Sequence, residues 1–136
     1  MAPLLLDTCA VLWIANGEQI LEDCRRAVDE AAPSDQILIS PITAWEIGTL
    51  VRKGRIALSM PPEAWFDAAL ALPGVRLAPM PPRTLIASAF LPGTPPADPA
   101  DRIIAATART EGFVLVTRDQ KLLSYGNEGH VRVLAC

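Results

Sequence analysis

Four acidic residues stand where carboxylates could hold a metal ion: Asp7, Glu46, Asp101 and Asp119. Asp7 directly follows the apolar run PLLL, and Asp119 follows a second apolar run, FVLV, after two residues. Carboxylate oxygens are ligands that favour Mg²⁺ or Mn²⁺ over zinc. A cation held in this way promotes hydrolysis of a phosphodiester, because it acidifies the attacking water and offsets charge on the leaving oxygen.

Helix capping is the competing interpretation of these acids. In the segment DPADRIIAATA (98–108), Asp98 is a good N-cap residue, Pro99 suits the first helical position, and Asp101 suits the first turn. Asp7 and Asp119 could likewise cap helices at 8–15 and 120–125, and Glu46 could be a solvated helix residue. We interpret Asp98 as the cap of its helix and Asp101 as the metal ligand.

The order of apolar segments predicts the elements that position these acids. Short continuous apolar runs, typical of buried parallel strands, occupy residues 3–6, 37–39, 75–78, 113–116 and 131–134. Helical spacing is found between them, at 8–15, 18–32, 43–53, 62–72, 82–91, 99–111 and 120–125. The alternation predicts an α/β layer fold, and the absence of a repeat or linker predicts one domain over residues 1–136.

In such folds ligands bind at the carboxyl ends of the strands. Asp7, Glu46 and Asp119 come just after strands, and the helix that Asp101 opens must begin at the same edge. All four acids can therefore converge on one rim of the sheet. Four carboxylates together raise one another's pKa values, so the arrangement is unfavourable without a cation.

Composition narrows the class of protein. The chain is 51% hydrophobic and 20% charged, which is typical of a globular domain. A formal net charge of −3 argues against tight non-specific binding of nucleic acid, but not against an enzyme that uses metal ions and a few arginines. Three cysteines without metal-ligand spacing are typical of a reduced, cytosolic protein. We expect neither a membrane span nor a signal peptide, since Asp7 and Asn16-Gly17 interrupt the first apolar stretch and no basic region precedes it.

Five segments together resemble a known family. They are LLLDT (4–8), SPITAWEI (40–47), VRKGRI (51–56), DPADRIIAATA (98–108) and LVTRD (115–119). The chain resembles the PIN-domain ribonucleases and, among them, the VapC toxins of bacterial toxin–antitoxin pairs. The resemblance implies a parallel sheet in the order 3-2-1-4-5 flanked by helices, cleavage of RNA with Mg²⁺ or Mn²⁺, and inhibition by a cognate antitoxin.

The resemblance also implies roles for single residues. Asp7, Glu46 and Asp101 match the first three acids of the family, and Asp119 matches the more variable fourth. Asp98 belongs to the DPxDR form of the motif, as a cap and as a group beyond the direct ligands. Where the family often has an aromatic residue, this chain has Ala100, a difference that concerns packing or substrate contact. Thr8 and Thr117 are expected to orient the ligands by hydrogen bonds.

Substrate and partner contacts are the remaining expectations. Arg102 and Arg118 adjoin proposed ligands, so we expect both to contact RNA. The cluster Arg52, Lys53 and Arg55 either complements a helix C-terminus or contacts phosphate. Trp13, Trp45 and Trp65 are expected in the core, while helices 8–15 and 43–53 could form an apolar groove for a helix of the antitoxin. The family resemblance implies a homodimer.

Two other functions are open at this stage. A binding module in which every acid is a cap would show no stabilisation by divalent cations. A phosphoryl-transfer protein of the receiver or haloacid-dehalogenase type also places aspartates at strand ends. It fits less well, because the third strand ends in APMPP and Cys9 stands where the dehalogenase pattern has a second aspartate.

Overall fold

The fold is built on a parallel β-sheet. The computed structural model describes residues 2–136, so Met1, the first residue of the predicted domain, lies outside the described residues. Within 2–136 the sheet has five strands: β1 (Leu4–Leu6), β2 (Ile37–Ile39), β3 (Val75–Leu77), β4 (Val114–Thr117) and β5 (Arg132–Ala135). Their order is β3-β2-β1-β4-β5 and all neighbours are parallel, which confirms the predicted topology.

Helices connect the strands. They are α1 (Thr8–Ala15), α2 (Glu22–Ala31), α3 (Pro41–Arg52), α4 (Pro62–Leu70), α5 (Pro82–Ala89), α6 (Pro99–Glu111) and α7 (Gln120–Asn127), with a 3₁₀ turn at Ala32–Ser34. None of the helices in residues 2–136 has both the length and the apolar character needed to cross a membrane.

Two predicted helix starts were wrong. The helix expected at 18–32 begins only at Glu22, because the turn at Asn16-Gly17, with Gly17 at φ +70°, is followed by an extended Leu21 that serves as the N-cap. Helix α3 begins at Pro41 and not at residue 43, because the Ser40 hydroxyl accepts a hydrogen bond from the Ile42 N–H and proline suits the first helical position.

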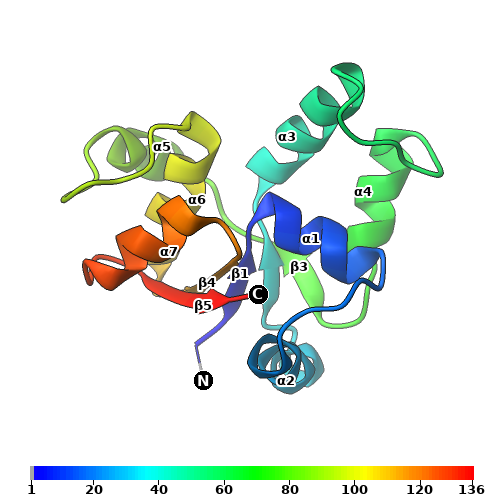
Figure 1. Cartoon of the computed structure of the whole chain (residues 1–136), viewed down its shortest axis with the longest axis horizontal. Helices are drawn as coiled ribbons and strands as arrows, with labels where there is room; N and C mark the ends of the chain where they lie inside the picture. The colour runs from blue at the N-terminus through cyan, green and yellow to red at the C-terminus, as the bar shows by residue number, and fades with distance from the viewer. Residues whose placement is uncertain (1) are drawn as a thin grey trace.

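The sheet separates two apolar cores. Leu5 aligns with Leu38 and Leu115 in the strand register, and these side chains pack with α6 and α7. The neighbouring residues of the same strands point to the opposite face, where they pack with α1, α2, α3 and α4. Figure 1 shows α5, α6 and α7 on one side of the sheet and α1, α3 and α4 on the other. The result is a three-layer α/β/α arrangement, which agrees with the sheet flanked by helices that the family resemblance implies.

The tryptophans do not all join the core. Trp65 is buried at 6% exposure, as predicted, but Trp45 is 61% exposed, so its predicted core position was wrong. Ile47, two residues later on α3, points inward with 1% exposure, which turns Trp45 toward solvent. Trp13 is partly buried and lies under the guanidinium of Arg118.

Candidate metal centre

The four predicted ligands come from four different helices or their N-caps around the carboxyl edge of the sheet. Asp7 follows β1 and caps α1, and Asp119 follows β4 and caps α7. Asp101 lies in the first turn of α6, whose N-cap is Asp98. Glu46 lies on α3, the helix that follows β2. The fold therefore places every predicted ligand at the edge where ligands of parallel α/β sheets bind.

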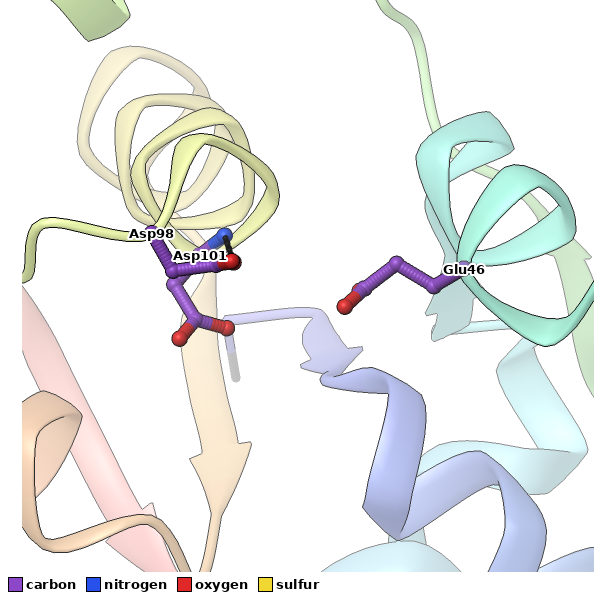
Figure 2. Close-up of side chains that lie close together, drawn as sticks. All are labelled: Glu46, Asp98 and Asp101. Carbon is purple, nitrogen blue, oxygen red and sulfur yellow. Dashed lines mark hydrogen bonds between the residues drawn. The ribbon is translucent and has the colours of Figure 1, made fainter. Parts of the chain in front are cut away.

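Two of the four predicted ligands, Glu46 and Asp101, lie in one cluster with Asp98, whereas Asp7 and Asp119 lie outside the acidic cluster found in the described residues. One oxygen each of Glu46, Asp98 and Asp101 lies within 4.8 Å of the others. Figure 2 shows Glu46 reaching from α3 across the gap toward Asp98 and Asp101 at the start of α6. The two helices are far apart in sequence, so this cluster is a product of the tertiary fold.

Both carboxylate oxygens of Asp7 accept hydrogen bonds. Asp7 is 5% exposed; its Oδ1 accepts the Ala10 N–H at 2.8 Å and its Oδ2 accepts the Thr117 hydroxyl at 2.5 Å. The Asp119 N–H donates in turn to Thr117 Oγ1 at 3.0 Å. This chain of hydrogen bonds joins the ends of β1 and β4 and orients the Asp7 carboxylate.

Glu46 is held by a threonine pair. The Thr8 hydroxyl donates to Glu46 Oε1, and Thr8 Oγ1 lies 3.2 Å from Thr43 Oγ1. Thr8 and Thr117 thus make the hydrogen bonds to carboxylates that the sequence suggested. Thr43 was missed, although its position three residues before Glu46 puts both on the same face of α3.

The raised pKa values of the carboxyl groups show that these groups are partly buried and lie close to one another. Burial raises the pKa of the Asp101 carboxyl from 3.8 to about 7, and Asp98, Glu46, Asp119 and Asp7 add to the rise. Burial likewise raises the pKa of Glu46, where Asp98 and Asp7 add to it, and that of Asp7, where the Thr117 hydrogen bond partly offsets it. The fold places these groups where their ionised forms repel one another, which a cation would relieve.

Capping and metal binding are compatible at this site. Asp98 Oδ2 accepts the Asp101 N–H at 2.9 Å, and Asp119 Oδ1 accepts the N–H groups of Lys121 and Leu122 at 2.8 and 3.0 Å. Asp98 is therefore the cap that the sequence predicted. It also lies in the acidic cluster with Glu46 and Asp101, and its place beyond the direct ligands stays a prediction.

The donor set fits a hard divalent cation. Asp7 is buried, Glu46 and Asp101 are half-buried, and Asp119 is exposed. These carboxylates come from separate elements and provide the oxygen ligands that Mg²⁺ and Mn²⁺ take. Asp7, Glu46, Asp101 and Asp119 would hold such an ion, with Asp98 beside them. The assignment of individual ligands stays a prediction.

The two arginines predicted to contact RNA are engaged with the protein itself. Arg102 donates from Nε to Ser88 O at 2.9 Å, and from Nη1 and Nη2 to Pro96 O and Ala89 O at 3.2 and 3.3 Å. These bonds tie the start of α6 to the end of α5. Arg118 stacks on Trp13, with its Cζ 3.7 Å from the ring centroid. Their contacts with RNA stay predictions.

Cys9 is a neighbour of the acids to which the sequence assigned no role at the site. It lies in the first turn of α1 with its side chain reaching the surface, and partial burial of the thiol raises its pKa to about 11, with Asp7, Glu46, Asp101 and Asp119 adding to the rise. The thiol is thus kept protonated beside the acids. Its position two residues after Asp7 was the available signal.

The apolar cavity beside α1 differs from the predicted groove. It has a volume of about 260 Å³ and is lined by side chains of α1, α2 and α4, including Val11, Val28 and Ala69. In the described chain α3 lines no part of this cavity. This cavity is therefore not the groove expected between α1 and residues 43–53, and that groove stays a prediction.

This chain is an α/β domain whose parallel sheet carries acidic residues from several helices at its carboxyl edge, an arrangement that can hold a metal ion. Comparison with known proteins makes the assignment specific: the PIN domain family model matches residues 4–128, and the chain belongs to this family.

Individual relatives agree with the family assignment. The chain is 31% identical over 98% of its length to Ribonuclease VapC22 of Mycobacterium tuberculosis, of which it covers 99%. The solved structure of VapBC2 from Rickettsia felis, bound to a DNA fragment from its promoter, has a similar fold with a TM-score of 0.71, at 16% identity and 97% coverage of both chains. DNA-bound VapBC from Salmonella typhimurium gives a TM-score of 0.67 at 20% identity, with 99% and 98% of the two chains covered.

Proposed function

We propose that this protein is a metal-dependent endoribonuclease and the toxin of a VapBC-like toxin–antitoxin pair. The observation that carries the proposal is the cluster of Glu46, Asp98 and Asp101 at the carboxyl edge of a PIN-domain sheet, with Asp7 and Asp119 following strands at the same edge. The relative named Ribonuclease VapC22, at 31% identity over nearly the whole of both chains, supports RNA as the substrate.

The chain's own residues have distinct tasks in this proposal. Asp7, Glu46, Asp101 and Asp119 would hold a Mg²⁺ or Mn²⁺ ion, which would supply positive charge to acidify a water and to offset charge on the phosphate. Thr117 and the Ala10 N–H hold the Asp7 carboxylate in one orientation, and Thr8 holds Glu46. Asp98 fixes the first turn of α6 and so the backbone that carries Asp101. These bonds preorganise the ligands before substrate arrives.

The proposal also includes a partner protein and the cellular compartment in which the enzyme acts. The fold shared with VapBC complexes supports a cognate antitoxin that inhibits the enzyme. We propose a single domain that acts in the cytoplasm as a homodimer, with RNA as substrate.

The test is cleavage of a mixed pool of structured and unstructured RNA by antitoxin-free protein. We expect cleavage with Mg²⁺ or Mn²⁺, none with a chelator, and a loss of at least about 100-fold for Asp7→Asn and for Asp101→Asn. Asp98→Asn keeps the acceptor oxygen of the cap and serves as the matched control on the same helix, with a far smaller loss.

The outcomes separate the alternatives. Metal-independent cleavage, or full activity of Asp101→Asn, would contradict the proposed site. A folded wild type that neither cuts RNA nor gains thermal stability with Mn²⁺ would instead favour the binding module whose acids are only caps.

A further inference from the structure

A second cavity lies on the same edge of the sheet as the acids. Its volume is about 440 Å³, within the range of roughly 300–1,000 Å³ that is typical of small-ligand pockets. The loop between α1 and α2 forms one wall, the start of α7 another, and the end of β5 a third. The lining residues that matter below are Gln19, Leu21, Arg118, Gln120 and Leu123.

The cavity adjoins the proposed metal centre through Asp119. Arg118 and Gln120, the residues on either side of Asp119, both line it. Strands β4 and β5 are parallel neighbours, and Thr117 aligns with Ala135, so the end of β5 reaches the same edge as the end of β4. A strand of RNA with a phosphate at the acids would have a neighbouring nucleotide at this cavity.

Arg118 is held in position to stack against a planar group. Trp13 covers one side of its guanidinium at 3.7 Å and is not among the residues that line the cavity, so the cavity meets another side. Arg118 Nη2 also donates to Gln19 O and Cys136 O at 3.4 and 3.3 Å. A guanidinium immobilised in this way is a stacking platform for an unstacked base.

The remaining side chains that line the cavity are neutral or apolar, so they fit the edge of a nucleic-acid base better than a phosphate group. Gln19 and Gln120 each offer an amide with two donors and an acceptor. Leu21 and Leu123 supply apolar surface, and Arg118 is the single cationic side chain among the described lining residues. This combination of a stacking surface, neutral amides and apolar walls is the chemistry by which proteins recognise single-stranded bases.

We propose that this cavity binds one unstacked base of the RNA beside the scissile phosphate, with Arg118 stacking on the base and Gln19 and Gln120 reading its edge. The inference rests on the proposed ribonuclease function and adds to it the residues that select where the RNA is cut. Selection then occurs next to the metal centre, on the side of β5.

The experiment maps cleavage of a random-sequence single-stranded RNA pool by wild type, Gln19→Ala and Gln120→Ala, each with Mn²⁺. Gln36→Ala is the matched control, because Gln36 precedes β2 at the opposite edge of the sheet. We expect wild type to prefer particular bases at a position adjoining the cut. The two cavity variants should lose roughly tenfold of that preference, while Gln36→Ala keeps it.

Arg118→Leu provides a second readout, because loss of the stacking platform should lower cleavage of the preferred RNA more than cleavage of disfavoured RNAs. Unchanged base preference in all three cavity variants, with cleavage intact, would overturn the inference and leave the ribonuclease function standing. Unchanged preference together with weaker binding of a partner protein would assign the cavity to that protein and also overturn it. Failure of wild type to cleave any RNA would refute the proposed function itself, and the inference with it.

Discussion

Replacing Asp101 by asparagine should stabilise the metal-free protein at high pH while abolishing its activity. The Asp101 carboxyl has a pKa raised to about 7 by burial and by its acidic neighbours, against 3.8 without these effects. Above pH 7 the folded protein must therefore carry an unfavourable negative charge there. Asparagine keeps the shape of the side chain without the charge.

The magnitude follows from that shift. A rise of about 3 pH units, at about 1.36 kcal/mol per unit, sets a ceiling of roughly 4 kcal/mol on the cost of ionised Asp101. Asp101 is only partly buried, and solvent screening reduces this to about 2 kcal/mol. The variant also loses about 0.5 kcal/mol of favourable interaction between the charge and the N-terminus of α6. The net gain is about 1.5 kcal/mol, or roughly 5 °C in Tm.

The gain depends on pH in a defined direction. Below about pH 4 the carboxyl is protonated in both the folded and the unfolded chain, so wild type and Asp101→Asn have equal stability. Between about pH 4 and pH 7 the unfolded chain releases a proton that the folded protein retains, and the stability of wild type falls relative to the variant. The full difference is present above pH 7.

The assay is thermal unfolding in a chelating buffer at pH 4 and pH 8, with Asp67→Asn, an exposed acid on α4, as the control for loss of one charge. Added Mn²⁺ at pH 8 should stabilise wild type by mass action and have little effect on Asp101→Asn. An Asp101→Asn variant with a lower Tm than wild type at pH 8 in chelator would refute the reasoning. It would mean that the negative charge of Asp101 does not destabilise the metal-free fold.

Three further predictions test the supporting structure. Thr117→Val removes the hydroxyl that donates to Asp7 Oδ2. The Mn²⁺ concentration needed for half-maximal thermal stabilisation should then rise at least about tenfold. An unchanged concentration would show that this hydrogen bond does not orient the Asp7 carboxylate. Thr84→Val should stabilise the protein by about 1 kcal/mol in urea unfolding, since Thr84 Oγ1 is buried without a protein partner in the described residues; a loss of stability would argue that the hydroxyl is satisfied. Gly74→Ala should cost about 3 kcal/mol or more in the same assay, because the new Cβ would lie 2.4 Å from Ala32 Cα and Gly74 has φ +81°. Gly48→Ala, whose Cβ would meet nothing within 4 Å, is its control and should be neutral or stabilising.

The sequence by itself determined the architecture, because the signals for it are local. Runs such as LLL at 4–6 and ILI at 37–39, separated by helical spacing, are sufficient to predict an α/β layer fold with buried parallel strands, whereas the strand order came from the family resemblance. Caps are local as well, since the acceptor of Asp98 and the N–H of Asp101 are three residues apart. The helix starts at 22 and 41 were less accessible, because flanking turns and proline shift the first residue.

Only the tertiary structure decided which polar groups meet. The hydrogen bonds from Thr117 to Asp7 and from Thr8 to Glu46 span 110 and 38 residues, and they exist because the sheet register aligns the ends of β1, β2 and β4. Side-chain direction depended on the same packing: Trp45 faces solvent because Ile47 takes the inward position on α3. Arg102 was predicted from its sequence neighbours to face the substrate, yet it binds carbonyls of the α5 end, since α5 packs beside α6. Local sequence thus sets the strands, helices and caps, whereas the site depends on contacts between residues distant in the chain that only packing brings together.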